Sequence, residues 1–392
     1  MIRLAPPERP LAPVQRASLG IGVLALLLCL IGAFLDPGRF FQSYLYAWLF
    51  MLGVALGSTT LLALHSLVGG IWGLLLRPWL ESFGRALPLA ILLGLPLAFG
   101  LPRIFPWLQG STAAPELAHQ AAYLNLPFFL ARQALYILVW IGLSRWLIRE
   151  AQAQDEEPHP ERGYRLQKLG AAWFLVYLVT ASFAAFDWVV SLEPGWNSSI
   201  FGFVWMTGEL LAALATAVAA FCWLMPRTEL RRVHHVHLRL NDMGNLLLTA
   251  VMTWAYVAFS QFLISWAGNL PETIVWYVRR IAGSWLLLTW FIALFQFALP
   301  FVCLLFRGIK RRPRPLGWLA ALLVLTQLIT TYWMVLPAFH PTGLRPHVLD
   351  VLAPLALGGL IAWEALRQLR RRDSLLPRDS RLTMEVPHGE PA

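Results

Sequence analysis

Apolar residues fill most of the chain, in runs that are long enough to cross a membrane as helices. The hydrocarbon core of a bilayer is about 30 Å thick and needs about 20 mostly apolar residues per helix. Ten stretches meet this requirement, at residues 17–35, 44–66, 83–101, 123–148, 168–190, 198–225, 244–267, 281–306, 316–338 and 346–367. The pattern predicts an all-α polytopic membrane protein with about ten transmembrane helices.

The connections between these stretches are too short to fold as separate domains. We expect a cytoplasmic tail over 1–16, one transmembrane domain over 17–368 and a disordered cytoplasmic tail over 369–392. The apolar stretch 67–80 is shorter than a span, so we expect an interfacial or re-entrant helix there. We expect the spans to be continuous helices without an inverted repeat. Gly53 and Gly57 predict a close contact between two helices.

Composition and charge agree with a membrane protein. Hydrophobic residues make up 58% of the chain and charged residues 13%, about half of the ~25% that is usual in soluble domains. This balance excludes an ordinary soluble enzyme, a disordered chain and a nucleic-acid-binding domain, despite the net charge of +10. With the N terminus inside, 25 of the 31 Lys and Arg residues face the cytoplasm. The bias places both termini there and explains the charge without a nucleic-acid partner.

The cysteines and histidines predict no redox centre in this chain. Cys29, Cys222 and Cys303 each lie alone in an apolar run, without metal-ligand spacing. Of the nine histidines, only His65 lies clearly inside a span, whereas a membrane haem needs facing pairs. His65 could hydrogen-bond a quinone carbonyl, or it could simply be a histidine with its hydrogen bonds satisfied at a helix end.

Ionisable residues inside the spans carry the functional information. Arg132 lies about 13 Å into the fourth span, near the midplane, and Glu209 lies at a similar depth in the sixth. Asp187 lies near the outer end of the fifth span. Such groups are costly in a bilayer and usually face a partner or a water-filled cavity. They predict either a proton or substrate path, or a structural ion pair of Arg132 with Glu209 or Asp187.

Four segments together carry a resemblance to a known family. They are SYLYAWLFMLGVALGSTTLLALHSLVGGIWGLLLRPWLE (43–81), YLNLPFFLARQALY (123–136), FDWVVSLEPGWNSSIFG (186–202) and WAYVAFSQFLISWAGNLPETIVWYVRR (254–280). In this order they resemble the F-type integral membrane subunit of the bacterial alternative complex III. That complex is a quinol:cytochrome c oxidoreductase, and this type of membrane subunit is related to the polysulfide-reductase membrane-subunit (NrfD-like) family.

The resemblance implies a fold and a set of partners. The family fold has two four-helix bundles, here residues 44–190 and 198–338, with the first and last spans flanking them. The implied partners are the homologous C-type membrane subunit of the complex, iron–sulfur and multihaem cytochrome subunits, and membrane lipids. Quinol, haem c and iron–sulfur clusters would belong to the partner subunits, with no cofactor in this chain. The family motifs include His65, Arg132, Asp187 and Glu272, whereas Glu209 lies outside them.

These observations lead to one expectation and two alternatives. We expect a cofactor-free subunit of a quinol-oxidising respiratory complex in the bacterial inner membrane, contributing assembly and proton conduction or the environment of a quinone site. Asp187 and Glu209 would exchange protons, and Arg132 would act on both by proximity. A secondary transporter could use the same buried charges for solute coupling. A purely structural membrane anchor would use them only for packing.

Overall fold

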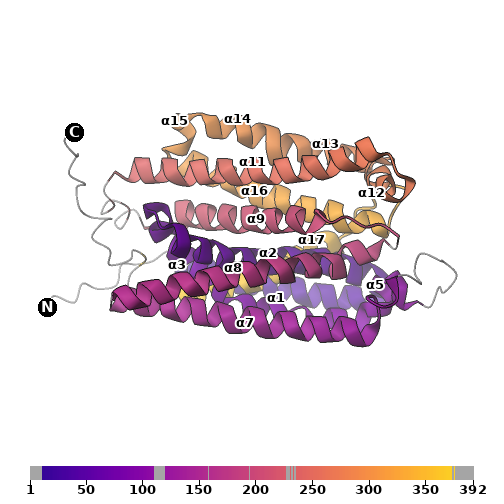
Figure 1. Cartoon of the computed structure of the whole chain (residues 1–392), viewed down its shortest axis with the longest axis horizontal. Helices are drawn as coiled ribbons and strands as arrows, with labels where there is room; N and C mark the ends of the chain where they lie inside the picture. The colour runs from indigo at the N-terminus through magenta and orange to yellow at the C-terminus, as the bar shows by residue number, and fades with distance from the viewer. Residues whose placement is uncertain are drawn as a thin grey trace.

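The computed structural model describes residues 11–109, 120–157, 159–193, 195–226, 230, 233, 235–372 and 375. Every regular element in these ranges is a helix, and ten helical segments are long and apolar enough to cross a membrane. The segments lie side by side along the long direction of the molecule (Figure 1). The predicted fold class, an all-α polytopic membrane protein, is confirmed.

Each predicted span corresponds to one helical segment. The segments are α1 (Leu11–Leu35), α2 (Pro37–Val68), α3 to α5 (Ile71–Ile104), α7 (Leu126–Glu156), α8 with η3 (Pro160–Leu192), α9 (Phe201–Leu224), α11 (Val236–Gly268), α13 to α14 (Trp285–Leu305), α16 with η5 (Pro313–Ala338) and α17 (Leu349–Arg370). Short helices lie between some of them: η2 (Pro106–Leu108), α12 (Pro271–Ile281) and α15 (Arg307–Lys310). Helices α7, α8 and α11 continue about two turns beyond the predicted spans, because their polar ends remain helical outside the apolar stretch.

The segments pack as two four-helix bundles with a flanking pair. Segments two to five, from α2 to α8, form the first bundle, and segments six to nine, from α9 to α16, form the second. Helix α2 joins the bundles because it packs on both α9 and α16. Helices α1 and α17 pair with each other and lie against α2. The arrangement agrees with the two bundles and flanking spans that the resemblance implies.

Both ends of the transmembrane domain lie at one end of the bundles. The Arg370 Nη1 atom of α17 donates to Gln15 Oε1 of α1 at 2.6 Å. Helices α3 and α15 lie at this end, and α5 and α12 lie at the opposite end (Figure 1). The distribution of Lys and Arg predicts that the first end is cytoplasmic, and we name the two ends the cytoplasmic end and the outer end accordingly. Residues 1–10 and 376–392 of the predicted tails lie outside the described residues, and α17 extends to Arg370, just inside the predicted tail.

Residues 67–80 do not form a separate interfacial helix. Gly69 and Gly70, with φ of 73° and 102°, reverse the chain after α2. Helix α3 (Ile71–Arg85) then opens the third segment and buries most of its residues, mainly against α2, α9 and α17. The prediction is wrong because it counted this apolar stretch alone. In the structure it joins the next apolar stretch in one segment that runs to Ile104.

The expectation of continuous helices is also wrong. In the third segment, α4 (Leu87–Leu92) passes through the 3₁₀ turn η1 (Leu95–Gly100) into α5 (Leu101–Ile104). Prolines occur at the start of each of these pieces, where a missing N–H is tolerated.

The eighth segment is interrupted by a π-helical turn. This turn, η4 (Ala293–Ala298), separates α13 (Trp285–Ile292) from α14 (Leu299–Leu305). Pro300 lies two residues after the end of this turn, and its ring removes one N–H and crowds the carbonyl four residues earlier. The Leu299 N–H accordingly reaches five residues back to the Leu294 carbonyl. Such turns are frequent at functional sites.

Candidate functional site

Two of the predicted membrane charges form one ion pair at the outer end of the first bundle. The Arg132 Nη2 and Nε atoms lie 2.7 and 3.0 Å from Asp187 Oδ1 and Oδ2. Asp187 is fully buried and Arg132 is 7% exposed. This two-pronged geometry is the strong form of an Arg–carboxylate pair. Of the two partners considered for Arg132, the structure selects Asp187.

Arg132 lies closer to the outer surface than predicted. Helix α7 begins at Leu126 and is capped by Asn125, whose Oδ1 accepts from the Phe128 N–H at 3.0 Å. Arg132 therefore lies about 9 Å from the start of its helix, and the predicted midplane depth is wrong. Its Nη1 donates to the Tyr123 carbonyl at 3.0 Å, and the Tyr123 ring centre lies 3.9 Å from the guanidinium carbon.

Two further side chains of α7 reach the Asp187 carboxylate. The Tyr136 hydroxyl donates to Asp187 Oδ2 at 3.0 Å, and the Gln133 amide donates to the same oxygen at 3.3 Å. Trp188 Nε1 fixes the other end of that amide by donating to Gln133 Oε1 at 2.9 Å. Sequence reasoning missed both residues. The signal for Tyr136 was its position one helical turn after Arg132, which places both on one helix face.

An apolar cavity of about 310 Å³ opens beside these side chains. It lies among α2, the interrupted third segment and α7. Its aromatic lining consists of Trp48, Phe105, Phe129, Trp140 and Trp188, and its polar end consists of Gln133 and Tyr136. An apolar, aromatic cavity with a few polar groups at one place is typical of a site for a small ligand with an apolar ring.

The interruption of the third segment shapes one wall of this cavity. The Gly94 N–H bonds to Ile91 O, which leaves the Ala90 carbonyl for Trp48 Nε1 at 2.8 Å. In the same way, the next turn leaves the Leu93 carbonyl for another side chain of α2, the Tyr44 hydroxyl, at 2.7 Å. Two aromatic side chains thus satisfy the carbonyls that the change of helix type sets free.

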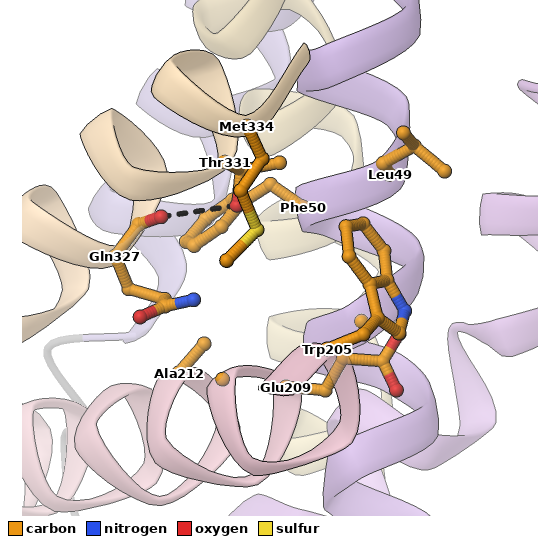
Figure 2. A pocket seen from close by; sticks show the side chains of 10 residues that line it. Leu49, Phe50, Trp205, Glu209, Ala212, Gln327, Thr331 and Met334 are labelled. Carbon is orange, nitrogen blue, oxygen red and sulfur yellow. Dashed lines mark hydrogen bonds between the residues drawn. The ribbon is translucent and has the colours of Figure 1, made fainter. Parts of the chain in front are cut away.

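Glu209 occupies a separate site between the two bundles. Its carboxylate accepts from the Tyr177 hydroxyl at 2.5 Å and from Trp205 Nε1 at 2.8 Å. Figure 2 shows Glu209 and Trp205 on α9, facing side chains of α2 and α16 across a small cavity of about 10 Å³. That volume has room for about one water molecule. Among the described residues, the only ion-pair partner of Arg132 is Asp187, so the expected action of Arg132 on both acids is not supported.

Small residues bring the backbones together at this site, as predicted. A Cβ atom on Gly53 would lie 2.9 Å from Glu209 Cγ, and one on Gly57 would lie 2.5 Å from the Glu209 backbone oxygen. The close contact between helices at Gly53 and Gly57 is therefore confirmed, and α9 is the partner helix.

A chain of buried amides continues from this cavity into the second bundle. Gln327 lines the cavity, and its Oε1 accepts from Gln296 Nε2 at 2.5 Å. The Thr326 hydroxyl in turn donates to Gln296 Oε1. Gln296 lies in the π-helical turn η4 and is fully buried. The irregular turn thus holds an uncharged polar group in the interior of the bundle.

His65 and Glu272 lie away from both sites. His65 is half-buried at the cytoplasmic end of α2, where Nε2 lies 2.9 Å from the Gly70 carbonyl and the ring packs on Trp72. This contact matches a histidine with its hydrogen bonds satisfied at a helix end. Glu272 is exposed in the first turn of α12 at the outer end. The structure therefore brings together only Arg132 and Asp187 among the five candidates.

Other buried ion pairs were missed by sequence reasoning. Arg39 at the start of α2 pairs with Asp350 of α17 at 2.5 Å, and Arg280 pairs with Glu193 at 2.7 Å. At the cytoplasmic end, Glu81 accepts from Arg77 at 2.7 Å and also from Arg372. Each of these ion pairs lies near the end of a predicted span. From the sequence alone, a charged side chain at such a position is expected to reach solvent.

Comparison with known proteins finds no protein-family model and no curated protein that matches this chain. Within the described ranges, no group of three or more His, Cys, Asp or Glu side chains is placed to hold a metal ion.

Proposed function

We propose that this multi-pass membrane protein is a subunit of a quinol-oxidising respiratory complex in the bacterial cytoplasmic membrane, similar to the F-type membrane subunit of alternative complex III. One observation carries the proposal: the outer cavity ends at Gln133 and Tyr136, and both are bonded to the buried Asp187 carboxylate. Segments 123–136 and 186–202, which carry part of the resemblance, supply all three side chains.

The cavity fits the chemistry of a quinone ring. Its apolar walls suit a ring and the start of an isoprenoid chain, and the indole rings of Trp48, Trp140 and Trp188 offer surfaces for stacking. The polar end is confined to Gln133 and Tyr136, which would contact a ring oxygen. In this proposal Gln133 and Tyr136, instead of His65, are the polar residues that contact the quinone.

The chain's own residues suit the acceptance of a proton. Tyr136 already donates its hydroxyl proton to Asp187, so its oxygen keeps lone pairs for a quinol hydroxyl. As the quinol proton reaches the Tyr136 oxygen, the Tyr136 proton moves to Asp187, and Arg132 supplies the countercharge for the carboxylate before transfer. A protonated Asp187 leaves Arg132 without its countercharge, so Asp187 would hold the first proton only briefly and release it to the outer side before it accepts the second. Iron–sulfur and haem c groups, expected in the partner subunits, would take up the two electrons.

The surroundings of Glu209 support a role for this side chain in proton exchange at the boundary between the bundles. It is a buried carboxyl with a hydroxyl partner and a water-sized cavity beside it.

The expected partners of the whole assembly are the homologous C-type membrane subunit and the iron–sulfur and multihaem cytochrome subunits.

The first experiment measures quinol oxidation by the complex purified from native membranes. Tyr136→Phe removes the proton route and keeps the ring, so we expect the rate to fall by about 10²-fold or more. Tyr256→Phe is the matched control, because Tyr256 is 73% exposed on α11. An unchanged rate in Tyr136→Phe, or purification without haem and iron–sulfur subunits, would overturn the proposal.

The second experiment measures proton release in reconstituted vesicles. Glu209→Gln keeps the size of the side chain and removes its exchangeable charge, so we expect less proton release per quinol, whereas Glu272→Gln at the exposed site keeps the wild-type value. Normal quinol oxidation and proton release in both Tyr136→Phe and Glu209→Gln would leave only the role of a structural anchor.

A secondary transporter is the second candidate, and the interrupted helices favour it. Broken helices line the substrate sites of many transporters. Here the third segment breaks beside the outer cavity and the eighth contains the π-helical turn. Solute uptake by vesicles that hold this chain alone would support the transporter and contradict the respiratory subunit.

A further inference from the structure

The connection between the eighth and ninth segments is strongly basic. Residues 307–314, here called the basic hairpin, contain Arg307, Lys310, Arg311, Arg312 and Arg314. No Asp or Glu occurs anywhere from 273 to 349, so no acid nearby in sequence balances these charges. The hairpin contains α15 and lies at the cytoplasmic end of the second bundle (Figure 1).

One basic residue fixes the hairpin, and the other four point outward. The Lys310 ammonium donates to Asn245 Oδ1 of α11 at 2.6 Å, and its stem lies over Gly244, where a Cβ would lie 2.5 Å from Lys310 Cγ. Lys310 is buried, whereas the four arginines of the hairpin are exposed. Anchoring through Lys310 thus holds a group of four positive charges at the surface.

The hairpin differs from those basic parts of the cytoplasmic face that are paired with acids. Six arginines there have an acid partner within 4 Å: Arg77 and Arg372 with Glu81, Arg162 with Glu157, Arg165 with Glu150, Arg239 with Asp242, and Arg367 with Glu364. Among the described residues, no ion pair involves an arginine of the hairpin. Helix α11, which packs on α15, has Asp242 as its one acid, and that acid lies 3.9 Å from Arg239.

Exposed aromatic and aliphatic side chains adjoin the charges. Trp318 lies one turn after Arg314 on α16 and is 70% exposed, and its ring meets the half-exposed Trp223 ring at 5.1 Å. Leu305 and Phe306, directly before the hairpin, are also exposed. The surface is therefore amphipathic, with arginines toward the cytoplasm and indole rings toward the bilayer, where Trp normally meets headgroups.

We propose that the basic hairpin and the Trp223–Trp318 pair bind an anionic phospholipid of the cytoplasmic leaflet. The arginines would contact its phosphate, and the indole and aliphatic side chains would contact the glycerol region and the start of an acyl chain. An acidic protein loop would match the charges but not the apolar flank, which faces the depth of the bilayer. This site is separate from the outer cavity and does not depend on the proposed respiratory function.

The test compares lipid retention by the full chain, purified with any subunits that accompany it and reconstituted in mixed phosphatidylcholine and phosphatidylglycerol. Native mass spectrometry counts the phosphatidylglycerol that stays bound. Changing Arg307, Arg311, Arg312 and Arg314 together to Gln should abolish the selective retention of phosphatidylglycerol. The matched control changes four of the acid-paired arginines, Arg162, Arg165, Arg239 and Arg367, to Gln, and should retain phosphatidylglycerol as the wild type does.

A second variant covers the case in which the loss of four charges prevents correct insertion. Trp223→Leu with Trp318→Leu keeps every charge and should still lower phosphatidylglycerol retention several-fold. Equal retention by the hairpin variant and its control would overturn the proposal. Loss of an acidic partner protein from the hairpin variant with unchanged lipid retention would also overturn it.

Discussion

Asp187 accepts hydrogen bonds from three side chains of α7 and lies fully out of contact with solvent. A buried pair of this kind costs desolvation of both charges, and the attraction between the partners offsets that cost only while both are present. Removal of one partner leaves the other charge buried alone. The pair is thus a strong structural constraint.

We predict that Asp187→Asn destabilises the protein by about 3–5 kcal/mol, because it leaves Arg132 buried without a countercharge. The double variant Arg132→Leu with Asp187→Leu should recover much of this loss. Glu157→Gln is the control and should change little, since Glu157 is 80% exposed in its ion pair with Arg162. Unfolding in detergent measures all three. A stable Asp187→Asn protein would contradict the buried pair.

His340 lies in a second polar cluster, at the outer end between α2 and α17. Its Nε2 faces Arg39 Nη1, which can only donate, and lies 3.0 Å from Gln42 Oε1. Burial, with the nearby charges of Arg39 and Arg345, lowers the pKa of His340, and Asp350 opposes this shift. The folded protein therefore binds a proton at His340 less readily than the unfolded chain does.

This difference predicts a pH dependence of stability. Above a pH of about 6.5 the ring is neutral in both states, and the cluster keeps its full stability. Below it the unfolded chain gains the proton first, so stability falls as the pH drops toward the folded pKa. His340→Gln should flatten this decline in the thermal midpoint, measured from about pH 8 to about pH 5. An identical decline in the variant would assign the effect to other groups.

At the residue scale the sequence predicted the presence of buried charges better than their pairing. Depth along a helix is measured from its ends, and the start of α7 at Leu126 moved Arg132 outward to the level of Asp187. The partner of Glu209 was not predictable, because the rotation of α8 that presents Tyr177 depends on the packing of several helices. Asp187, near the outer end of its span, was placed correctly.

At the element scale, the boundary between the bundles depends on small residues of α2. Gly57 lies so close to α9 that an added Cβ would meet the Glu209 oxygen at 2.5 Å and the Ala213 Cβ at 2.9 Å. The first of these is backbone, so relief requires the helices to move apart. Close approach of this kind is how helices associate inside a bilayer.

We predict that Gly57→Ala destabilises the protein by about 1–3 kcal/mol, because overpacking outweighs the better helix propensity of Ala. Gly20→Ala is the control, since an added Cβ on α1 would meet nothing within 4 Å. Thermal unfolding of both variants measures the difference. Equal midpoints for the two would show that the bundles do not pack through Gly57.

At the element scale, hydropathy predicts where the transmembrane segments lie but not where they are interrupted. Apolar length predicted all ten segments, because crossing a membrane requires little more than that. It did not predict the interrupted third segment or the π-helical turn, because a window average does not register Pro96 or Pro300. Both residues were visible in the sequence as positions without a backbone donor. The cavity wall formed by the interruption was therefore missed with it.

At the scale of the whole molecule, the two proposed binding sites lie at opposite ends of the bundles. The outer end holds the cavity and the Arg132–Asp187 pair, and the cytoplasmic end holds the basic hairpin, with Glu209 between the bundles. This arrangement supports release of protons on the outer side and lipid contact on the inner side.

The most direct test of the central claim is photolabelling of the purified complex with an azido-quinone, followed by peptide mapping. The account predicts labels on the cavity walls, in residues 91–105 and 129–140, and unlabelled quinol should compete them away. Labels confined to the region of His65, or no label on this chain in a complex that still oxidises quinol, would contradict the quinone cavity.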